Sequence, residues 1–237
     1  MQQRNVVSPH RHNRLLAAVG AAELDRLAPH LEIVDLAPRT VLVDVGERIK
    51  HVYFPHSAVI CLMAVMEESG VAEAATIGSE GMAGIEALLG MPTAANRMLI
   101  QVSGAASRIS ARHLATAIDD NAKLRVVLLR YIGAFMIQLT QSVACNSLHK
   151  LEERCCRWLL MAHDRAHRDR FEITQEFMAE MLGVHRPTVT IVARTLQKAG
   201  LIRYSRGVLT ILDRNGLEAG ACECYGIVRR AHDEIFT

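Results

Sequence analysis

The sequence predicts an α+β fold in which an N-terminal antiparallel β-barrel of jelly-roll type precedes a long helix and a C-terminal helical module. Short apolar runs separated by turn residues fill residues 31–110, and a proline-free amphipathic stretch covers 113–145. Two helical segments followed by a hairpin pattern cover 174–212. With 237 residues, 50% of them hydrophobic, the chain can bury two cores.

The N-terminal half of the chain predicts short helices and then strands. Residues 12–30 have apolar positions at spacings of three and four, which favours one or two short helices. Seven apolar runs then follow at close spacing, which is typical of an antiparallel barrel or sandwich. They are LEIVDL, TVLVDV, HVYF, AVICLMAV, VAEAATI, RMLIQV and ASRIS. A glycine-rich segment at 78–92 interrupts them, either as the mouth of a ligand site or as an ordinary connection.

One long helix is predicted over 113–145, with apolar residues that alternate by four and three along one face. This seam resembles a short coiled coil, so we expect it to pair with a second copy of the chain, although packing on its own barrel is the alternative. The predicted dimer interface consists of Leu124, Leu128, Tyr131, Phe135 and Leu139. Asn146 and Ser147 indicate a break, and we place the hinge between the domains there.

The C-terminal module fits a helix-turn-helix position by position. Thr174 is a suitable N-cap, and Gly183 supplies the positive φ that ends the first helix. Pro187 lies in the first turn of the second helix, where its missing N–H costs nothing. After Gly200, the segment LIRYSRGVLTIL predicts a tight hairpin, so the whole is a winged helix-turn-helix.

Charge and spacing predict that this module binds DNA. Residues 183–210 carry five Lys/Arg and no Asp/Glu, whereas residues 1–112 carry ten cations against eleven acids. With Val189, Val192 and Leu196 facing inward, the second helix presents a basic outward face to base edges and phosphates. The predicted readers are His185, Arg186, Thr188, Thr190 and Arg194, with Arg203 and Arg206 of the hairpin on phosphate.

The order of barrel, long helix, hinge and winged helix resembles the Crp/Fnr family of bacterial transcription regulators over nearly the whole chain. VHRPTVTIVARTLQKAGLI is the most specific part of this resemblance. It implies a homodimer, joined through 113–145, that binds two-fold-symmetric double-stranded DNA and acts with RNA polymerase. Arg186 matches the family's arginine at the start of the recognition helix, but Pro187 and Ile191 depart from its other base readers, so a different operator is expected.

The resemblance also implies a cyclic-nucleotide-binding-like sensor domain, whose pocket is degenerate here. Gly81 and Met82 replace the Gly-Glu pair that holds the ribose in members that bind cyclic AMP, and Met82 cannot accept a hydrogen bond from a hydroxyl. Asn96 and Arg97 align with the Arg-Ser pair that holds the phosphate. Arg97 thus stands one residue away from the family's arginine. On a strand such a displacement turns the side chain to the other side of the sheet, so Arg97 cannot replace the missing cation. We therefore expect no cyclic AMP binding, and the effector is unknown.

The remaining sequence signals favour no cofactor, no metal and no catalysis. The chain lacks the N-terminal cysteine cluster of the iron–sulfur branch, and His51 and His56 read as surface residues more than haem ligands. Cys222 and Cys224 are too close in sequence for the usual structural zinc pair, so inert thiols are favoured. The chain shows no GxSxG, HExxH or phosphate-loop motif, which argues against an enzyme.

The sequence therefore predicts a cytoplasmic regulator with four segments. A sensor domain with short N-terminal helices covers 1–112, the dimerisation helix 113–145, the winged helix-turn-helix 146–215 and a C-terminal helical extension 216–237. No run of about 18 consecutive apolar residues and no secretory signal is present. The alternative is a non-DNA regulatory adaptor, in which the dimeric barrel senses a ligand or protein partner. The role of the extension is not predicted.

Overall fold

The computed structural model describes residues 8–68 and 70–237, and it begins with short helices as predicted. The polar segment at 1–7 lies outside the described residues. Asn13 caps the first α-helix, because its side chain accepts a hydrogen bond from the N–H of Leu16. The elements are η1 (Pro9–His12), α1 (Arg14–Ala18), α2 (Ala21–Leu27) and η2 (Ala28–His30).

The seven predicted strands are all present, but they form two open antiparallel sheets rather than one closed barrel. The strands are β1 (Glu32–Leu36), β2 (Val41–Val43), β3 (His51–Pro55), β4 (Val59–Met66), β5 (Gly70–Ile77), β6 (Arg97–Val102) and β7 (Gly104–Ser110). One sheet has the order β1-β7-β3 and the other β2-β6-β4-β5. The main apolar core lies between them. The glycine-rich segment between β5 and β6 holds only a short 3₁₀-helix, η3 (Ile85–Leu89).

The predicted long helix is two helices, α3 (Ala111–Asp120) and α4 (Ala122–Leu148), so the prediction of one helix over 113–145 was wrong. Asn121 separates them with an extended backbone, and its side chain caps α4 by accepting from the N–H of Leu124. The hinge lies at His149 and Lys150, a few residues after the predicted break, because α4 continues through Asn146 and Ser147.

The face of α4 that was predicted to form the dimer interface packs on its own chain. Leu124, Leu128, Tyr131 and Phe135 are buried in the core of the sensor domain, and Leu139 packs against that core. The spacing of three and four identified the apolar face correctly, but the core of the chain's own sensor domain already covers it. Although α4 is long and apolar enough to span a membrane by length and composition alone, this face makes it a core helix of the described fold.

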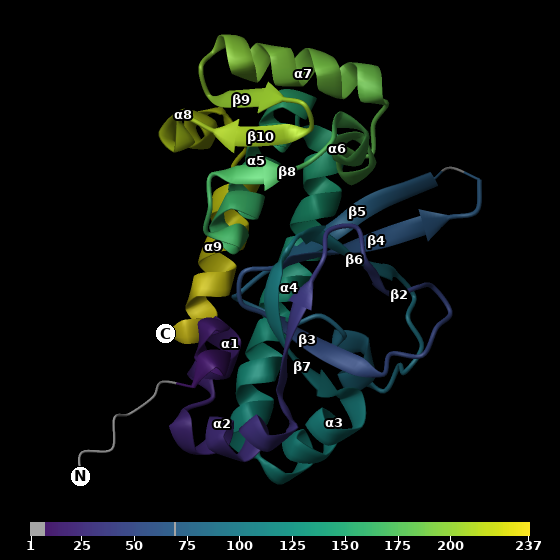
Figure 1. Ribbon diagram of the computed structural model, residues 1–237, viewed down its shortest axis with the longest axis vertical. Coiled ribbons are helices and arrows are strands. Elements are labelled where there is room, and N and C mark those ends of the chain that lie inside the picture. Colours follow the sequence, from purple (N-terminus) through teal and green to yellow (C-terminus); the bar gives the residue numbers. More distant parts are fainter. Residues whose placement is uncertain (1–7, 69) are drawn as a thin grey trace.

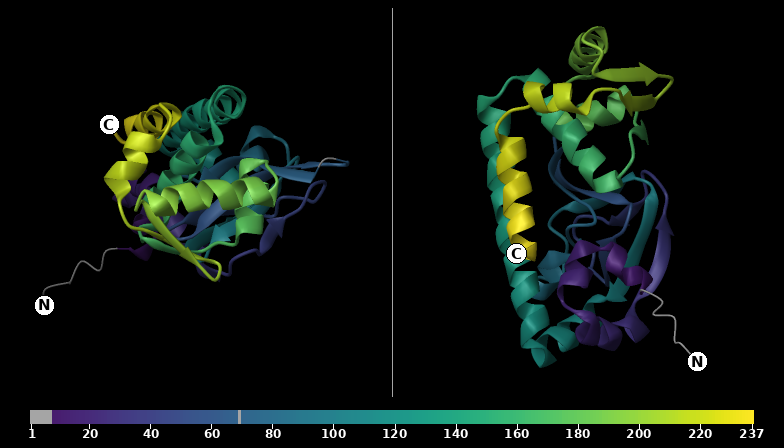
Figure 2. Two further views of the ribbon diagram at one scale, coloured as in Figure 1. Left: turned by 90° about the horizontal axis from the view of Figure 1, so that it is seen from above. Right: turned by 90° about the vertical axis from the view of Figure 1, so that its left-hand side faces the viewer.

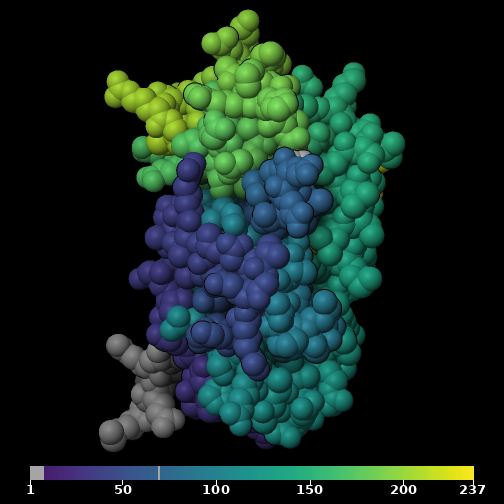
Figure 3. All heavy atoms as spheres, turned by 90° about the vertical axis from the view of Figure 1, so that its right-hand side faces the viewer, coloured from purple at the N-terminus to yellow at the C-terminus, as the bar shows by residue number. Residues whose placement is uncertain are grey.

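The C-terminal module follows the hinge and sits at one end of the molecule (Figure 1). It contains α5 (Leu151–Ala166), β8 (Arg170–Glu172), α6 (Gln175–Leu182), α7 (Arg186–Lys198), β9 (Ile202–Ser205) and β10 (Val208–Ile211). The three strands form a sheet of order β8-β10-β9, one strand more than the predicted hairpin. In Figure 3 this green module rests directly on the blue strands of the sensor domain.

The C-terminal extension consists of α8 (Arg214–Gly220), α9 (Cys224–Asp233) and η4 (Glu234–Phe236). Figure 2 shows α9 running beside α4, back from the helix-turn-helix module toward the N-terminal helices. Ile235 is buried in the sensor core, and Arg14 pairs with Asp233 at 3.1 Å. The chain therefore returns to the sensor domain after completing the C-terminal module.

Candidate functional site

Helices α6 and α7 form the predicted helix-turn-helix. The hydroxyl of Thr174 caps α6 by accepting from the N–H of Phe177 at 3.1 Å, and Gly183 ends the helix with a φ of 64°. Val189, Val192 and Leu196 are buried against the rest of the module, as their spacing predicted. The opposite face of α7 is thereby fixed toward the solvent, and α7 is the outermost element at that end (Figure 1).

Most of the predicted DNA-contacting residues lie on this exposed surface. His185, Arg186, Thr188 and Arg194 are exposed on or beside α7. Arg186 lies 3.8 Å from a carboxylate oxygen of Glu176, and both side chains are 63% exposed. A pair this exposed contributes little to stability, so the guanidinium can exchange Glu176 for another acceptor.

Two residues of α7 depart from the prediction. Thr190 is half-buried, and its hydroxyl donates to the side chain of Gln175 at 2.8 Å, or to the carbonyl of Arg186 at 3.1 Å. It therefore belongs to the junction with α6 rather than to the outward face. Ile191 is 63% exposed and stands on the outward face instead. The sequence singled out Ile191 only as a departure from the family's base readers, because the exposure of an apolar residue depends on the rotation of the helix.

The hairpin between β9 and β10 is the predicted wing. Arg206 and Gly207 occupy its two-residue turn with φ values of 51° and 75°. Two consecutive positive φ angles match a type I′ turn, whose twist suits a two-residue hairpin. Arg203 on β9 and Arg206 at the tip are both exposed. The wing thus holds two cations beside the basic face of α7.

The side chain of Tyr131 on α4 packs tightly against the glycine-rich segment of the sensor domain. The hydroxyl of Tyr131 donates to the carbonyl of Met82 at 2.9 Å, and both residues are almost fully buried. A Cβ atom on Gly81 would lie 2.5 Å from the ring of Tyr131, so even the smallest added side chain does not fit. Burial also raises the pKa of Tyr131 far above its usual value.

The second half of the predicted degenerate pocket is engaged elsewhere. Arg97 donates two hydrogen bonds to Asp44, at 3.0 and 2.8 Å, and these bonds lower the pKa of Asp44. Its neighbours Asn96 and Met98 are half-buried and buried, respectively. The guanidinium of Arg97 is thus engaged by Asp44 in a partly exposed pair within the sensor domain.

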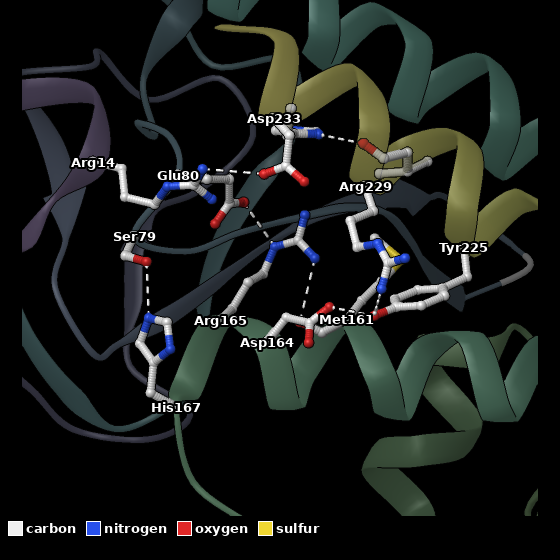
Figure 4. A pocket seen from close by; sticks show the side chains of 12 residues that line it. Arg14, Ser79, Glu80, Met161, Asp164, Arg165, His167, Tyr225, Arg229 and Asp233 are labelled. Carbon is white, nitrogen blue, oxygen red and sulfur yellow. Dashed lines mark hydrogen bonds and ion pairs between the residues drawn. The ribbon is translucent and has the colours of Figure 1, made fainter. Parts of the chain in front are cut away.

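A buried ion pair joins the sensor domain to the first helix of the C-terminal module. Arg165 on α5 donates to Glu80 at 2.8 Å (Figure 4), and it also donates to the side chain of Gln138 on α4 at 3.0 Å. Burial alone would raise the pKa of Glu80, but Arg165, His232 and backbone N–H groups outweigh it, so the pKa is lowered. One guanidinium therefore connects three elements on both sides of the hinge.

A cavity of about 170 Å³ lies beside this pair, between the sensor domain, α5 and α9. Ser79 and His167 meet across it at 3.0 Å, and Arg14 reaches Asp233 from the N-terminal helices (Figure 4). Its lining is largely charged, and neighbouring charges already pair with one another. The cavity is therefore part of the junction between the two domains.

The histidines considered as haem ligands make ordinary polar contacts. His56 is buried, contrary to the predicted surface position, and its Nε2 contacts the hydroxyl of Ser107 at 2.7 Å. Burial, with smaller contributions from His12 and His10, lowers the pKa of His56 to about 4. His51 is half-buried on β3. The same hydroxyl of Ser107 also contacts Nδ1 of His10, so Nε2 of His56 is part of a hydrogen-bonded group within the chain.

One group of described residues has the chemistry of a metal site, contrary to the prediction of inert thiols. Cys145, His149, Cys222 and Cys224 place one donor atom each within 4.8 Å of all the others. The Cys145 pKa is lowered to about 5, first by the hydrogen bond with Cys222. Sequence reasoning missed this group because Cys222 and Cys224 were judged by their own spacing, whereas the fold adds two ligands from α4.

The fold and the exposed basic helix together define a class of protein, namely a DNA-binding regulator with a sensor domain. Comparison with protein families matches residues 153–219 to the Crp-like helix-turn-helix domain. No curated protein matches the chain.

Solved structures of the same architecture match over most of the chain. A Eubacterium rectale protein assigned to the crp/fnr family of transcriptional regulators shares 17% identity, with a TM-score of 0.68 over 89% of this chain and 98% of its own. CLP, a c-di-GMP responsive global regulator of Xanthomonas campestris, shares 14%, with a TM-score of 0.67 over 82% and 100%. FixK2 of Bradyrhizobium japonicum shares 13%, with a TM-score of 0.68 over 81% and 98%.

The C-terminal part of the chain is therefore a Crp-like helix-turn-helix domain, and the chain as a whole has the fold of these Crp/Fnr-type structures. This confirms the resemblance found in the sequence.

Proposed function

We propose that the protein is a cytoplasmic, sequence-specific regulator that binds double-stranded DNA as a homodimer and acts with RNA polymerase. The observation that carries this proposal is the outward face of α7, which projects from the molecule and carries cations without acids. A protruding helix of this kind enters the major groove, while a basic wing contacts the adjacent phosphates.

The exposed side chains divide into base readers and phosphate contacts. Arg186 lies at the start of α7, where a guanidinium can form a bidentate contact with a guanine, and Thr188 is beside it. Ile191, which replaces Thr190 in this role, presents a methyl-rich surface suited to a thymine methyl group. Arg194, Arg203 and Arg206 are placed to contact phosphate and to fix the position of the module.

A second apolar stripe on α4 supports dimerisation. Its positions alternate by three and four residues on the side opposite the sensor core, and all are exposed. They are Val126, Leu129, Gly133, Met136, Thr140, Val143 and Ser147. Val143 is 70% exposed, which is unusual for a residue of this type unless it is covered by a partner. The repeat matches the seam of a two-stranded coiled coil, so we place the second copy here.

Two arginine substitutions test the assignment of readers. Arg186→Ala is expected to weaken binding to the preferred sequence by roughly 1–3 kcal/mol and to relax base preference. Arg206→Ala is expected to weaken binding to all sequences alike and to reduce the salt dependence by about one phosphate contact. Fluorescence anisotropy over a salt series measures both quantities.

Arg48→Ala is the matched control, because Arg48 is exposed on the sensor domain away from α7 and the wing. Its DNA affinity should equal that of the unmodified protein. Equal, sequence-independent losses from Arg186→Ala and Arg206→Ala would contradict the division into readers and anchors. Unchanged affinity in all three variants would place DNA binding elsewhere on the chain, and no binding even by the unmodified protein would favour an adaptor that does not bind DNA.

We also propose that cyclic AMP is not the effector. The ring of Tyr131 occupies the space beside Gly81, Met82 offers no acceptor, and Arg97 is paired with Asp44. Calorimetric titration with cyclic AMP should therefore give no saturable heat. A one-to-one isotherm with micromolar or tighter affinity would refute the argument from these residues.

A further inference from the structure

Three cysteines and one histidine meet where the C-terminal extension reaches the end of α4. Cys145 lies in the last turn of α4, and His149 ends that helix. Cys222 lies in the connection between α8 and α9, and Cys224 is the first residue of α9. The three cysteines are buried and form a small cluster of their own, while His149 is half-buried.

The distances between the donor atoms suit a single metal ion. The Sγ atoms of Cys145 and Cys222 are 3.5 Å apart, and the Sγ of Cys224 is 3.5 Å from Nδ1 of His149. In a tetrahedral zinc site with Zn–S bonds of about 2.3 Å, neighbouring ligand atoms lie roughly 3.8 Å apart. Since all four donors lie within 4.8 Å of one another, they are too close together to surround a multi-iron cluster.

The surrounding charges are also consistent with a cluster of thiolates. Arg157 is 6% exposed, and its Nε has no hydrogen-bond partner among the described residues. Arg154 likewise leaves its Nε unsatisfied, and neither guanidinium forms an ion pair with a carboxylate in the described part of the chain. Both act electrostatically on Cys145. Three thiolates and one Zn²⁺ carry a net charge of −1, which would be favourable beside the buried Arg157 and the half-buried Arg154.

We propose that Cys145, His149, Cys222 and Cys224 bind one Zn²⁺ in a closed tetrahedral site. Four protein ligands of this type leave no open position, so the site is structural rather than catalytic. Because Lys150, at the hinge, directly follows His149, the metal would tie the extension to the last residue before the C-terminal module. From that anchor α9 runs to the sensor domain, so metal binding would fix the extension across both domains.

Cobalt and zinc titrations of the reduced, metal-free full chain test this proposal. One Co²⁺ per chain should bind with the intense visible absorption of tetrahedral cobalt and with thiolate-to-metal charge-transfer bands, and Zn²⁺ should displace it. Zinc should also protect three of the six thiols, namely those of Cys145, Cys222 and Cys224, from alkylation as identified by mass spectrometry.

Cys224→Ser should lower zinc affinity at least tenfold, since loss of even an indirect partner of a metal costs about 10–100-fold. Cys61→Ser is the control, because Cys61 is also buried but lies on β4. No uptake by the unmodified chain, a weak octahedral spectrum, or equal affinities of the two variants would overturn the proposal. Should Cys224→Ser fail to fold, the cobalt spectrum and the alkylation pattern of the unmodified chain decide; a Cys145–Cys222 disulfide in place of metal uptake also overturns it.

Discussion

Replacing Met136 and Val143 together with glutamate is expected to convert the protein into a monomer. Both side chains lie on the exposed stripe of α4, at 60% and 70% exposure, so in the free chain they contact little that a charge would disrupt. Across a two-stranded seam, four carboxylates would face one another without water. Sedimentation velocity should show half the mass, and operator affinity should fall roughly 100-fold or more because two linked half-site contacts become one.

The double variant Leu89→Glu/Met91→Glu is the matched control, since it places two carboxylates on apolar side chains that are 55% and 54% exposed on another surface. It should remain dimeric and bind DNA normally. A dimer of unchanged mass from the Met136 and Val143 variant would place the interface elsewhere. Charging Leu128 or Phe135 would not be an equivalent test, because both belong to the sensor core and their substitution should unfold the domain.

Replacing Arg165 with methionine is expected to lower the free energy of unfolding by about 3–5 kcal/mol, because it leaves the carboxylate of Glu80 buried without its partner. The side chains of Arg165 and Glu80 are only 6% and 10% exposed. Since the pKa of Glu80 is lowered in the folded state, its contribution is present above the unfolded value near 4.5 and is lost as the pH falls below it. Urea denaturation at pH 7 measures the difference.

A double variant separates the charge effect from loss of packing. Glu80→Met/Arg165→Met removes both charges, so it should be far more stable than Arg165→Met alone. Arg108→Met is the control, because Arg108 pairs with an exposed Glu32 and its loss should cost less than about 1 kcal/mol. A loss as small for Arg165→Met as for Arg108→Met would show that the pair does not hold the two domains together.

The elements that follow from local rules were predictable from the sequence. Short apolar runs separated by turn residues placed all seven strands of the sensor domain. The cap at Thr174, the glycine at 183 and the buried face of α7 placed the helix-turn-helix. Local rules failed where two signals compete. The apolar spacing around Asn121 predicts a continuous helix, whereas Asn121 itself is a suitable N-cap for a new one. Only this single residue of the sequence signals the break between α3 and α4.

Long-range pairing accounts for what sequence reasoning missed. An apolar seam on α4 is the same pattern whether a partner helix or the chain's own domain covers it. Here the core of the sensor domain buries Leu124, Leu128, Tyr131 and Phe135, while a second stripe stays exposed. The same limit applies to the cysteines. Cys222 and Cys224 have an unsuitable spacing by themselves, and only the return of α9 along α4 brings Cys145 and His149 to them.

The partial match between α7 and the expected readers has a simple geometric origin. One residue corresponds to a rotation of about 100° around a helix. The packing of α7 on α6 turns Thr190 toward Gln175 and Ile191 toward the solvent. Hence the identity of the helix was predictable, while the choice between adjacent readers required the rotation that the structure supplies.

Selection of bound fragments from random double-stranded DNA tests the central claim most directly. We expect the unmodified protein to enrich one two-fold-symmetric sequence whose half-sites lie about one helical turn, 10 base pairs, apart. The Arg186→Ala variant should enrich sequences that are degenerate at one position in each half-site. Recovery of no common sequence from the unmodified protein, or of the same sequence with equal stringency from both proteins, would contradict recognition of DNA through α7.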